Sequence, residues 1–267
     1  MELRDDELVN FEAQGAVLPA GGEQGVVERD GARIWYAAYG QGVPVILLHG
    51  GLGHSGNFAH QVPALIDAGY RAVVIDSRGH GRSTRDDKPY SYGLMGDDVL
   101  AVMDALAIDK VPVVGWSDGA CVGLVLAKEN PGRISGVLFF ACNVDPSGTR
   151  PFEFTLILGR CINRHRADYA ALSATPDQFD AFSKAVGLMQ RTQPDYAAAD
   201  LESVTVSVTV VQSEFDEFIT PEHAAYIART IPQGSLVELA GVSHFAPLQR
   251  PALFNGAMLD FLAGLAR

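Results

Sequence analysis

The feature that most constrains the fold of this chain is a series of short, continuously apolar runs separated by segments with helical periodicity. Such runs are typical of strands buried on both faces of a parallel sheet. The predicted strands of this kind are 43–49, 71–76, 111–116, 134–141, 206–212 and 236–240. Because a predicted helix lies between each pair, we expect an α/β fold with a mostly parallel sheet and helices on both faces.

The pattern also divides the chain. Two further predicted strands, 25–28 and 32–39, surround an Asp-Gly turn and indicate a hairpin. The polar residues 1–24 are interpreted as a partly helical arm outside the core. Between 145 and 204 the strand pattern disappears and helices are expected. We therefore predict a core made of 25–144 and 205–267, with residues 145–204 as a helical cap (lid) over one end of the sheet.

Composition excludes several classes of protein. The net charge is −12 and no long basic run occurs, which argues against nucleic acid and anionic membrane surfaces as partners. No apolar run has the length of a membrane span and no signal peptide is recognisable, so a cytoplasmic location is expected. The sequence does not define an oligomeric state. A small-molecule substrate is the expected partner.

The three cysteines, Cys121, Cys142 and Cys161, are widely spaced. This spacing is neither a disulfide framework nor a zinc motif, and we expect no metal or cofactor. Cys121 and Cys142 lie in apolar runs and are interpreted as small buried hydrophobic residues.

The segment Gly115-Trp116-Ser117-Asp118-Gly119 stands between a predicted strand and a predicted helix. Strand, Gly-x-Ser-x-Gly and helix form the arrangement of a nucleophile elbow. A serine at such a sharp turn takes strained backbone angles. The flanking glycines lack the Cβ atoms that would collide with the neighbouring strand and helix.

Polar residues that follow the other strands give the elbow a context. Ligands of an open parallel sheet bind beyond the carboxyl ends of its strands. At those ends the chain carries one nucleophile, Ser117, one carboxylate, Asp216, and one imidazole, His244, in the order Ser, Asp, His. Three other carboxylates could replace Asp216: Glu214 and Glu217 share its loop, and Asp145 follows the strand before the cap.

On these segments the chain resembles the α/β-hydrolase family, from about Gly25 to the C-terminus. The resemblance rests on 49–53 (HGGLG), 76–83 (DSRGHGRS), the elbow, Asp216 and 241–245 (GVSHF). The elbow is also similar to that of valacyclovir hydrolase (biphenyl hydrolase-like) proteins. The resemblance implies a serine hydrolase that cleaves a small carboxylic ester or related acyl compound. Lactonase, amidase, C–C hydrolase and perhydrolase activities share the same triad. A serine nucleophile argues against epoxide hydrolase chemistry, for which relatives use aspartate.

Chemistry then assigns a role to each residue. His244 takes the proton of Ser117, and Asp216 fixes the imidazole tautomer. The oxyanion needs backbone N–H donors, which are expected from Asp118 and from Gly51, with Leu52 as the next candidate. Leu52, Trp116 and Phe245 are the predicted lining of an apolar substrate pocket.

Two alternative hypotheses assign the chain to another class of protein. The run 51–56 (GLGHSG) matches Gly-x-Gly-x-x-Gly, and Asp76 ends the next strand, as in a dinucleotide-binding unit. This reading leaves Ser117, Asp216 and His244 unexplained. The other alternative is a ligand receptor that keeps the fold without turnover.

The side chain of Asp118 generates a first prediction. A carboxylate in the first turn of a helix is stabilised by the helix dipole, or it could hold a cationic group of the substrate. If it holds a cation, an amino-acid ester is hydrolysed faster than its des-amino analogue, and Asp118→Ala removes the difference. Initial rates on the matched ester pair measure it, and equal rates in the parent protein would exclude cation recognition.

Overall fold

A single sheet carries the chain in this computed structural model, which describes residue 3 and residues 7–265. Its strand order is β1-β2-β4-β3-β5-β6-β7-β8. The pairs β1–β2 and β2–β4 are antiparallel, and all the other neighbours are parallel. The strands are β1 (Glu23–Arg29), β2 (Ala32–Tyr39), β3 (Val43–Leu48), β4 (Tyr70–Ile75), β5 (Val111–Trp116), β6 (Ile134–Phe140), β7 (Ser207–Phe215) and β8 (Gly234–Ser243). The predicted mostly parallel α/β fold is confirmed.

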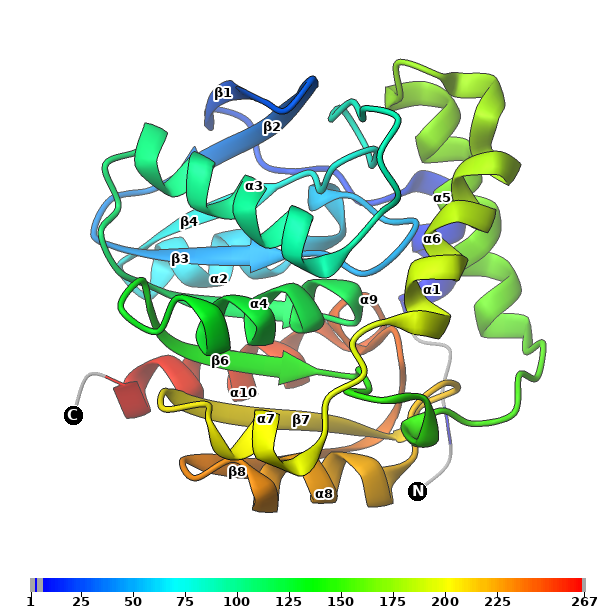
Figure 1. Cartoon of the computed structure of the whole chain (residues 1–267). Helices are drawn as coiled ribbons and strands as arrows, with labels where there is room; N and C mark the ends of the chain where they lie inside the picture. Colours follow the sequence, from blue (N-terminus) through cyan, green and yellow to red (C-terminus); the bar gives the residue numbers. More distant parts are fainter. Residues whose placement is uncertain (1–2, 4–6, 266–267) are drawn as a thin grey trace.

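Helices cover both faces of the sheet (Figure 1). One face carries α3 (Tyr92–Ala105), α4 (Asp118–Glu129) and α8 (Pro221–Thr230). The other carries α2 (Gln61–Asp67), α9 (Ala246–Gln249) and α10 (Pro251–Leu265). The last helical part of the chain, 246–265, is divided into α9 and α10. Arg250 leaves the helical region, with φ −136° and ψ 72°, because the residue before a proline is disfavoured there.

The two faces explain the continuous apolar runs. Successive side chains of a strand point to opposite faces of the sheet. In β3, Ile46 and Leu48 join the core on the α3–α4 face, whereas Val45 and Leu47 join the core on the α2–α10 face. Since both faces are covered, every position must be apolar, and the alternating pattern of a half-exposed strand is lost.

A helical insertion connects β6 to β7 at the carboxyl ends of the parallel strands. It consists of α5 (Leu156–Leu172), α6 (Phe179–Thr192) and α7 (Ala198–Glu202), with short 3₁₀ turns at Pro146–Gly148 and Pro176–Gln178. In Figure 1 the arrowheads of β3 and β6 point toward α5 and α6. The predicted helices of this region are present. That residues 145–204 act as a lid stays a prediction.

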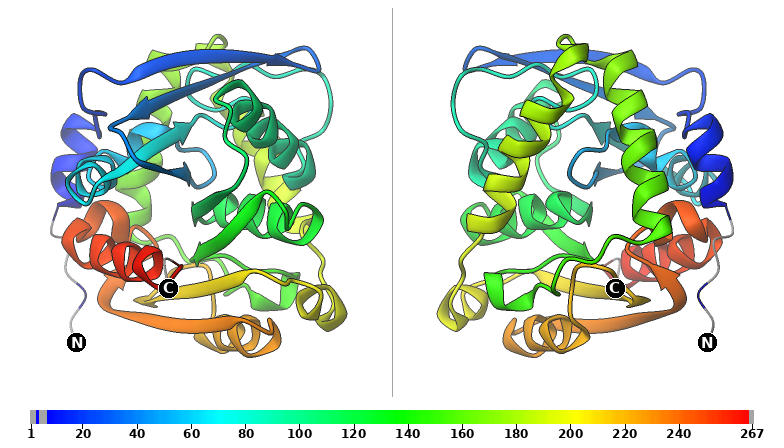
Figure 2. Two further views of the ribbon diagram at one scale, coloured as in Figure 1. Left: turned by 90° about the vertical axis from the view of Figure 1, so that its left-hand side faces the viewer. Right: turned by 90° about the vertical axis from the view of Figure 1, so that its right-hand side faces the viewer.

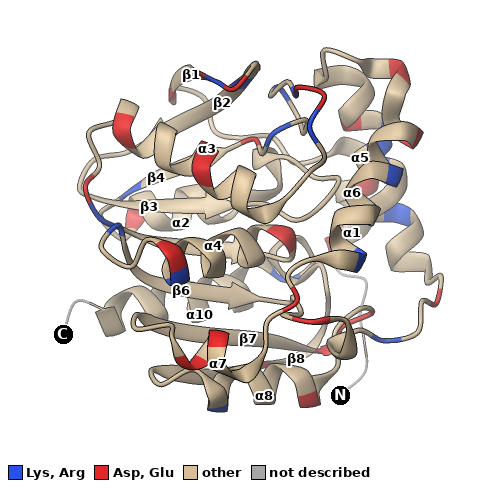
Figure 3. Cartoon of the chain, in the orientation of Figure 1, with Lys and Arg blue, Asp and Glu red and all other residues tan. Residues whose placement is uncertain are grey.

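Charged residues are distributed over the whole molecule. Figure 3 shows Lys and Arg interspersed with Asp and Glu around the sheet and on α5 and α6. No helix among the described residues is long and apolar enough to cross a bilayer.

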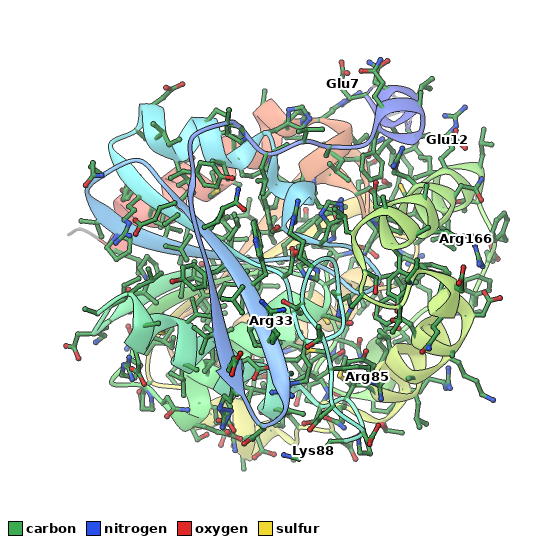
Figure 4. The ribbon with its side chains drawn as sticks, turned by 90° about the horizontal axis from the view of Figure 1, so that it is seen from above. Glu7, Glu12, Arg33, Arg85, Lys88 and Arg166 are labelled. Carbon is green, nitrogen blue, oxygen red and sulfur yellow. The ribbon has the colours of Figure 1, made fainter. Side chains whose placement is uncertain are left out.

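The N-terminal segment differs from expectation. Leu8 and Phe11 on α1 (Leu8–Gln14) are 0% and 4% exposed and belong to the core on the α2–α10 face. α1 lies beside α5 in both views of Figure 2, and Figure 4 shows Glu12 on α1. The Glu12 carboxylate lies 3.3 Å from Arg160 of α5. The expectation that this arm lies outside the core is therefore wrong for α1, because α1 packs against α5 and α9 with both apolar side chains buried. Residues 1–2 and 4–6 of the predicted arm lie outside the described residues.

The buried side chain on α1 generates a second prediction. Replacing Phe11 by alanine is expected to lower the free energy of unfolding by about 3–5 kcal/mol, because a large core side chain leaves a cavity. Urea unfolding measures the effect. Val9→Ala on the same helix is the matched control, since Val9 is 50% exposed, and it is expected to change stability little. Equal effects of the two substitutions would contradict the assignment of Phe11 to the core.

Candidate active site

The nucleophile elbow has the strained geometry that the sequence indicated. Ser117 lies between β5 and α4 with φ 53° and ψ −121°, a conformation that costs a non-glycine residue about 1–3 kcal/mol. A Cβ on Gly115 would lie 2.5 Å from the Cα of Ala120. A Cβ on Gly119 would collide with the carbonyl oxygen of Leu48. Both glycines are therefore required for β5 and α4 to pack this closely around Ser117.

His244 and Asp216 are brought together from two neighbouring strands. Asp216 follows β7 and His244 follows β8. The Nδ1 atom of His244 lies 3.2 Å from each carboxylate oxygen of Asp216. Oδ1 of Asp216 also accepts the backbone N–H groups of Phe218 and Ile219, each at 2.9 Å. Since Nδ1 must donate to the carboxylate, Nε2 of the neutral ring is left as the acceptor.

The other carboxylates considered for this position are engaged elsewhere. Glu214 accepts the backbone N–H of Gly241 at 2.7 Å. Glu217 accepts the backbone N–H of His244 at 2.9 Å, so it holds the loop and not the ring. Asp145 caps the turn at Ser147 and lies 4.0 Å from His223. Asp216 is the carboxylate in contact with the His244 ring.

The environment of His244 favours its protonated form. Burial lowers the pKa of this imidazole, but the Asp216 charge, its hydrogen bond and the nearby Glu217 and Asp118 outweigh burial, so the pKa is raised above its ordinary value. The ring centroid of Phe218 lies 4.7 Å away in an edge-to-face contact. Packing of this kind fixes the plane of the imidazole.

A cavity of about 550 Å³ opens at the carboxyl end of the sheet and joins these groups. Ser117 and His244 both line it. The other predicted site residues in its wall are Gly51, Leu52, Trp116, Asp118 and Phe245. Asp216 is not in the wall, because it lies behind His244 with its side chain 0% exposed.

The helical insertion supplies wall residues that the sequence did not predict. They include Leu158, Ile162 and His165 of α5 and Gly187, Gln190 and Arg191 of α6. Their helices could be read from periodicity, but nothing in their spacing shows which side chains face Ser117. Only the docking of α5 and α6 on the sheet brings them to the cavity.

The two segments expected to donate to the oxyanion lie against Ser117. Asp118 is the first residue of α4, so its N–H has no carbonyl partner within the helix. A Cβ on Gly50 would lie 3.2 Å from the Cβ of Ser117, and one on Gly51 would lie 2.6 Å from Oδ2 of Asp118. Leu52 has a positive φ of 63°. The backbone of this loop therefore passes directly beside the elbow, although its role as a donor stays a prediction.

The Asp118 carboxylate has partners from two helices. Tyr92 Oη donates to Oδ1 at 2.9 Å, and Gln190 Nε2 lies 3.1 Å from both oxygens. Burial raises the pKa of Asp118 to about 6, against the opposing effect of these hydrogen bonds. A carboxylate with three contacts retains limited capacity for a further donor. Neither Tyr92 nor Gln190 carries a motif by which the sequence would have shown it.

The loop after β4 is structural. Asp76 accepts the backbone N–H groups of Ser55 and Arg82, each at 2.8 Å, and its Oδ2 lies 3.0 Å from the Arg82 guanidinium. It thereby ties the Gly-rich loop after β3 to the loop after β4. In a dinucleotide-binding unit this acidic residue would bind a ribose. Here it is committed to the loops, which removes the main support for that reading.

Among the described residues, no group of three or more His, Cys, Asp and Glu side chains is arranged to hold a metal ion.

The fold and the cavity define a hydrolase architecture, and comparison with known proteins agrees. A family model for the alpha/beta hydrolase fold matches residues 43–156. A Caulobacter vibrioides protein assigned as a carbamate hydrolase, RutD, is 30% identical over 247 residues, which cover 84% of this chain and 91% of that protein. The chain belongs to the α/β-hydrolase family.

Solved structures show the same fold. Est816, described as an N-acyl homoserine lactone degrading enzyme, is 28% identical with a TM-score of 0.70, covering 89% of this chain and 100% of its own. The enol-lactonase from Burkholderia xenovorans LB400 is 21% identical with a TM-score of 0.74, covering 90% of this chain and 100% of its own, and supports the fold alone. Hydrolysis is the class of activity that these relatives support. The finer likeness to valacyclovir hydrolase stays a prediction.

The histidine environments generate a third prediction. In an NMR titration, His244 is expected to show a pKa raised above that of an ordinary imidazole, because of the Asp216 charge. Burial instead lowers the pKa of His49 to about 4 and those of His80 and His165 to about 3. Asp216→Asn removes the adjacent charge and is expected to lower the pKa of His244. Asp145→Asn is the control, because its charge raises the pKa of His223 and not that of His244. A shift of His244 in the control, with none in Asp216→Asn, would overturn the pairing.

Proposed function

We propose that this protein is a serine hydrolase that cleaves a small carboxylic ester or related acyl compound through an acyl-enzyme. The observation that carries the proposal is the meeting of Ser117, on its strained turn, and His244, held by Asp216, in one cavity. A serine hydroxyl is a weak nucleophile without an adjacent base, and this arrangement supplies both the base and its orienting carboxylate.

In the proposed reaction, Nε2 of His244 accepts the proton of Ser117 as Oγ attacks the substrate carbonyl. The tetrahedral intermediate carries a negative oxygen, which the backbone N–H groups of Gly51 and Asp118 stabilise. The imidazolium of His244 then protonates the leaving group, and the acyl group remains on Ser117. Water, deprotonated by the same ring, attacks the acyl-enzyme and releases the acid.

The charge pattern of the site suits this sequence of steps. Asp216 is fully buried and lies against Nδ1, so it stabilises the imidazolium as that cation forms. A raised pKa of His244 makes the ring a stronger base than a free imidazole. His244 must be deprotonated before it can act as the base. Activity is therefore expected to decline as the pH falls through the pKa of His244.

Binding would use the apolar wall on either side of Ser117. Trp116 and Phe245 are 2% and 5% exposed, and with Leu52 they form the core side of the cavity. The opposite side comes from α5 and α6 of the insertion. A wall of this composition fits a compact acyl or alcohol group, and the insertion is where specificity would reside.

A lactone is the second candidate substrate, because a lactone is a cyclic ester that the same steps would open. The similarity to Est816 at 28% identity over 89% of this chain favours it. Because RutD is assigned as a carbamate hydrolase, a carbamate is a further substrate to test. Amide, C–C and perhydrolase activities remain alternatives on the same three residues.

Removing the nucleophile gives the fourth prediction. Ser117→Ala is expected to lower kcat by roughly 10⁴-fold or more, as loss of a triad nucleophile does in other enzymes. The measurement is a rate panel of p-nitrophenyl esters, an acyl homoserine lactone, a carbamate, amides and amino-acid esters. Ser173→Ala, in the loop after α5, is the control and is expected to retain full activity.

Two outcomes would oppose this proposal in different ways. Undiminished hydrolysis by Ser117→Ala would exclude the mechanism. Labelling of Ser117 by a fluorophosphonate without turnover of any member of the panel would favour the receptor reading. Binding of a nicotinamide cofactor, or thermal stabilisation by it, would support the hypothesis of a dinucleotide-binding protein.

A further inference from the structure

Two of the three cysteines meet beside the cavity. The Sγ atoms of Cys121 and Cys142 lie 2.8 Å apart, and both residues are free thiols. Cys121 lies on α4, one turn after Ser117, and Cys142 follows β6. A disulfide bond is about 2.05 Å long, so the two sulfurs are within about 1 Å of bonding distance. The sequence interpretation of both residues as small buried hydrophobic side chains describes their burial but not this contact.

The two cysteines differ in access. Cys142 lines the cavity that contains Ser117 and is 5% exposed, whereas Cys121 is 0% exposed and lies behind it. Cys121 is also 3.3 Å from the carbonyl oxygen of Asn143, another wall residue. A small oxidant in the cavity would therefore reach Cys142 first.

Cys161 provides an internal comparison. It is 0% exposed and lies on α5, in the core on the α2–α10 face, whereas Cys121 and Cys142 lie in the core on the α3–α4 face. Burial raises the pKa of its thiol. Like the other two it is a free thiol.

We propose that Cys121 and Cys142 form a reversible oxidation site, at which a small peroxide that enters the cavity converts the two thiols to a disulfide. Disulfides of this kind in a reducing compartment are transient and redox-sensing, unlike the structural bridges of secreted proteins. The site shares a wall with the proposed active site but uses none of its three catalytic groups.

The chemistry balances in two steps. The Cys142 sulfur, as its thiolate, attacks one oxygen of hydrogen peroxide, and the O–O bond breaks to give a sulfenic acid and hydroxide. The hydroxide takes up the proton that the Cys142 thiol released and becomes the first water. The Cys121 sulfur then attacks the Cys142 sulfur, the S–O bond breaks, and hydroxide leaves with the proton of Cys121 as a second water. Two thiols lose two electrons and two protons, and one peroxide is reduced to two water molecules.

The order of the steps follows from the surroundings. Burial, the hydrogen bond to Cys142 and the nearby Asp118 raise the pKa of the Cys121 thiol, so Cys121 is a poor first nucleophile. The thiolate is the reactive form of a cysteine, so the reaction is expected to accelerate as the pH rises.

The bond would join two parts of the cavity. Cys121 belongs to the helix that begins at Asp118, and Cys142 is next to Asn143 in the wall. Tyr92, which donates to Asp118, also lies beside Cys121. Oxidation would thus tie α4 to the wall beyond β6. Any effect on turnover rests on the proposed function, but formation of the bond does not.

The test uses the full chain treated with hydrogen peroxide, then denatured, alkylated and mapped by mass spectrometry without reduction. We expect two of the three cysteines to be lost to alkylation, in one cross-linked peptide pair that contains Cys121 and Cys142 and that dithiothreitol separates. Cys161 is expected to remain alkylatable. Oxidation that leaves Cys121 and Cys142 as alkylatable as Cys161, or a bridge that includes Cys161, would overturn the proposal.

Three variants sharpen the result. Cys161→Ser is expected to form the same bridge as the parent protein. Cys121→Ser is expected to stop at a sulfenic acid on Cys142, which a cyclic diketone traps, whereas in Cys142→Ser no bridge forms and Cys121 stays reduced. Ser117→Ala is expected to form the bridge normally. Because the mapping needs no substrate, failure of this site and failure of the proposed hydrolysis are distinguishable.

Discussion

The close packing of β5 and α4 against β3 is the constraint on which the site depends. Gly119 lies so near the Leu48 carbonyl that no side chain fits, and Gly115 is similarly close to Ala120. This packing holds Ser117 at a positive φ of 53°, and Ser117 lines the cavity at the end of the sheet. The same close packing brings the Gly50-Gly51 backbone against the elbow. It therefore determines the positions of both the nucleophile and the expected oxyanion donors.

The two buried carboxylates near His244 illustrate how position determines role. Asp216 lies behind the ring, where two backbone N–H groups and Nδ1 satisfy its oxygens. Asp118 lies in the cavity wall, where Tyr92 and Gln190 hold it and burial raises its pKa to about 6. Both charges favour a protonated His244, but only Asp216 can fix its tautomer.

Local patterns were sufficient for much of this structure. The apolar runs gave the strands because both faces of the sheet are covered, and the elbow followed from two glycines at fixed spacing. Local patterns failed where a segment is stabilised by distant partners. Phe11 is apolar within a short polar segment, and its burial depends on α5, which lies far along the chain. Gln190 and Tyr92 are unremarkable in sequence and acquire a role only through their contacts with Asp118.

The sequence by itself determined the sheet, the elbow and the order of Ser117, Asp216 and His244, because hydrophobic periodicity and glycine spacing are local properties. Only the tertiary structure decided which of four carboxylates contacts the His244 ring, since Asp145, Glu214, Asp216 and Glu217 differ in the direction of their side chains and not in their chemistry. It also decided that Cys121 and Cys142 meet, because their sulfurs come from a helix and a strand end that pack side by side. Contacts between distant segments depend on how the layers dock, which no local pattern encodes.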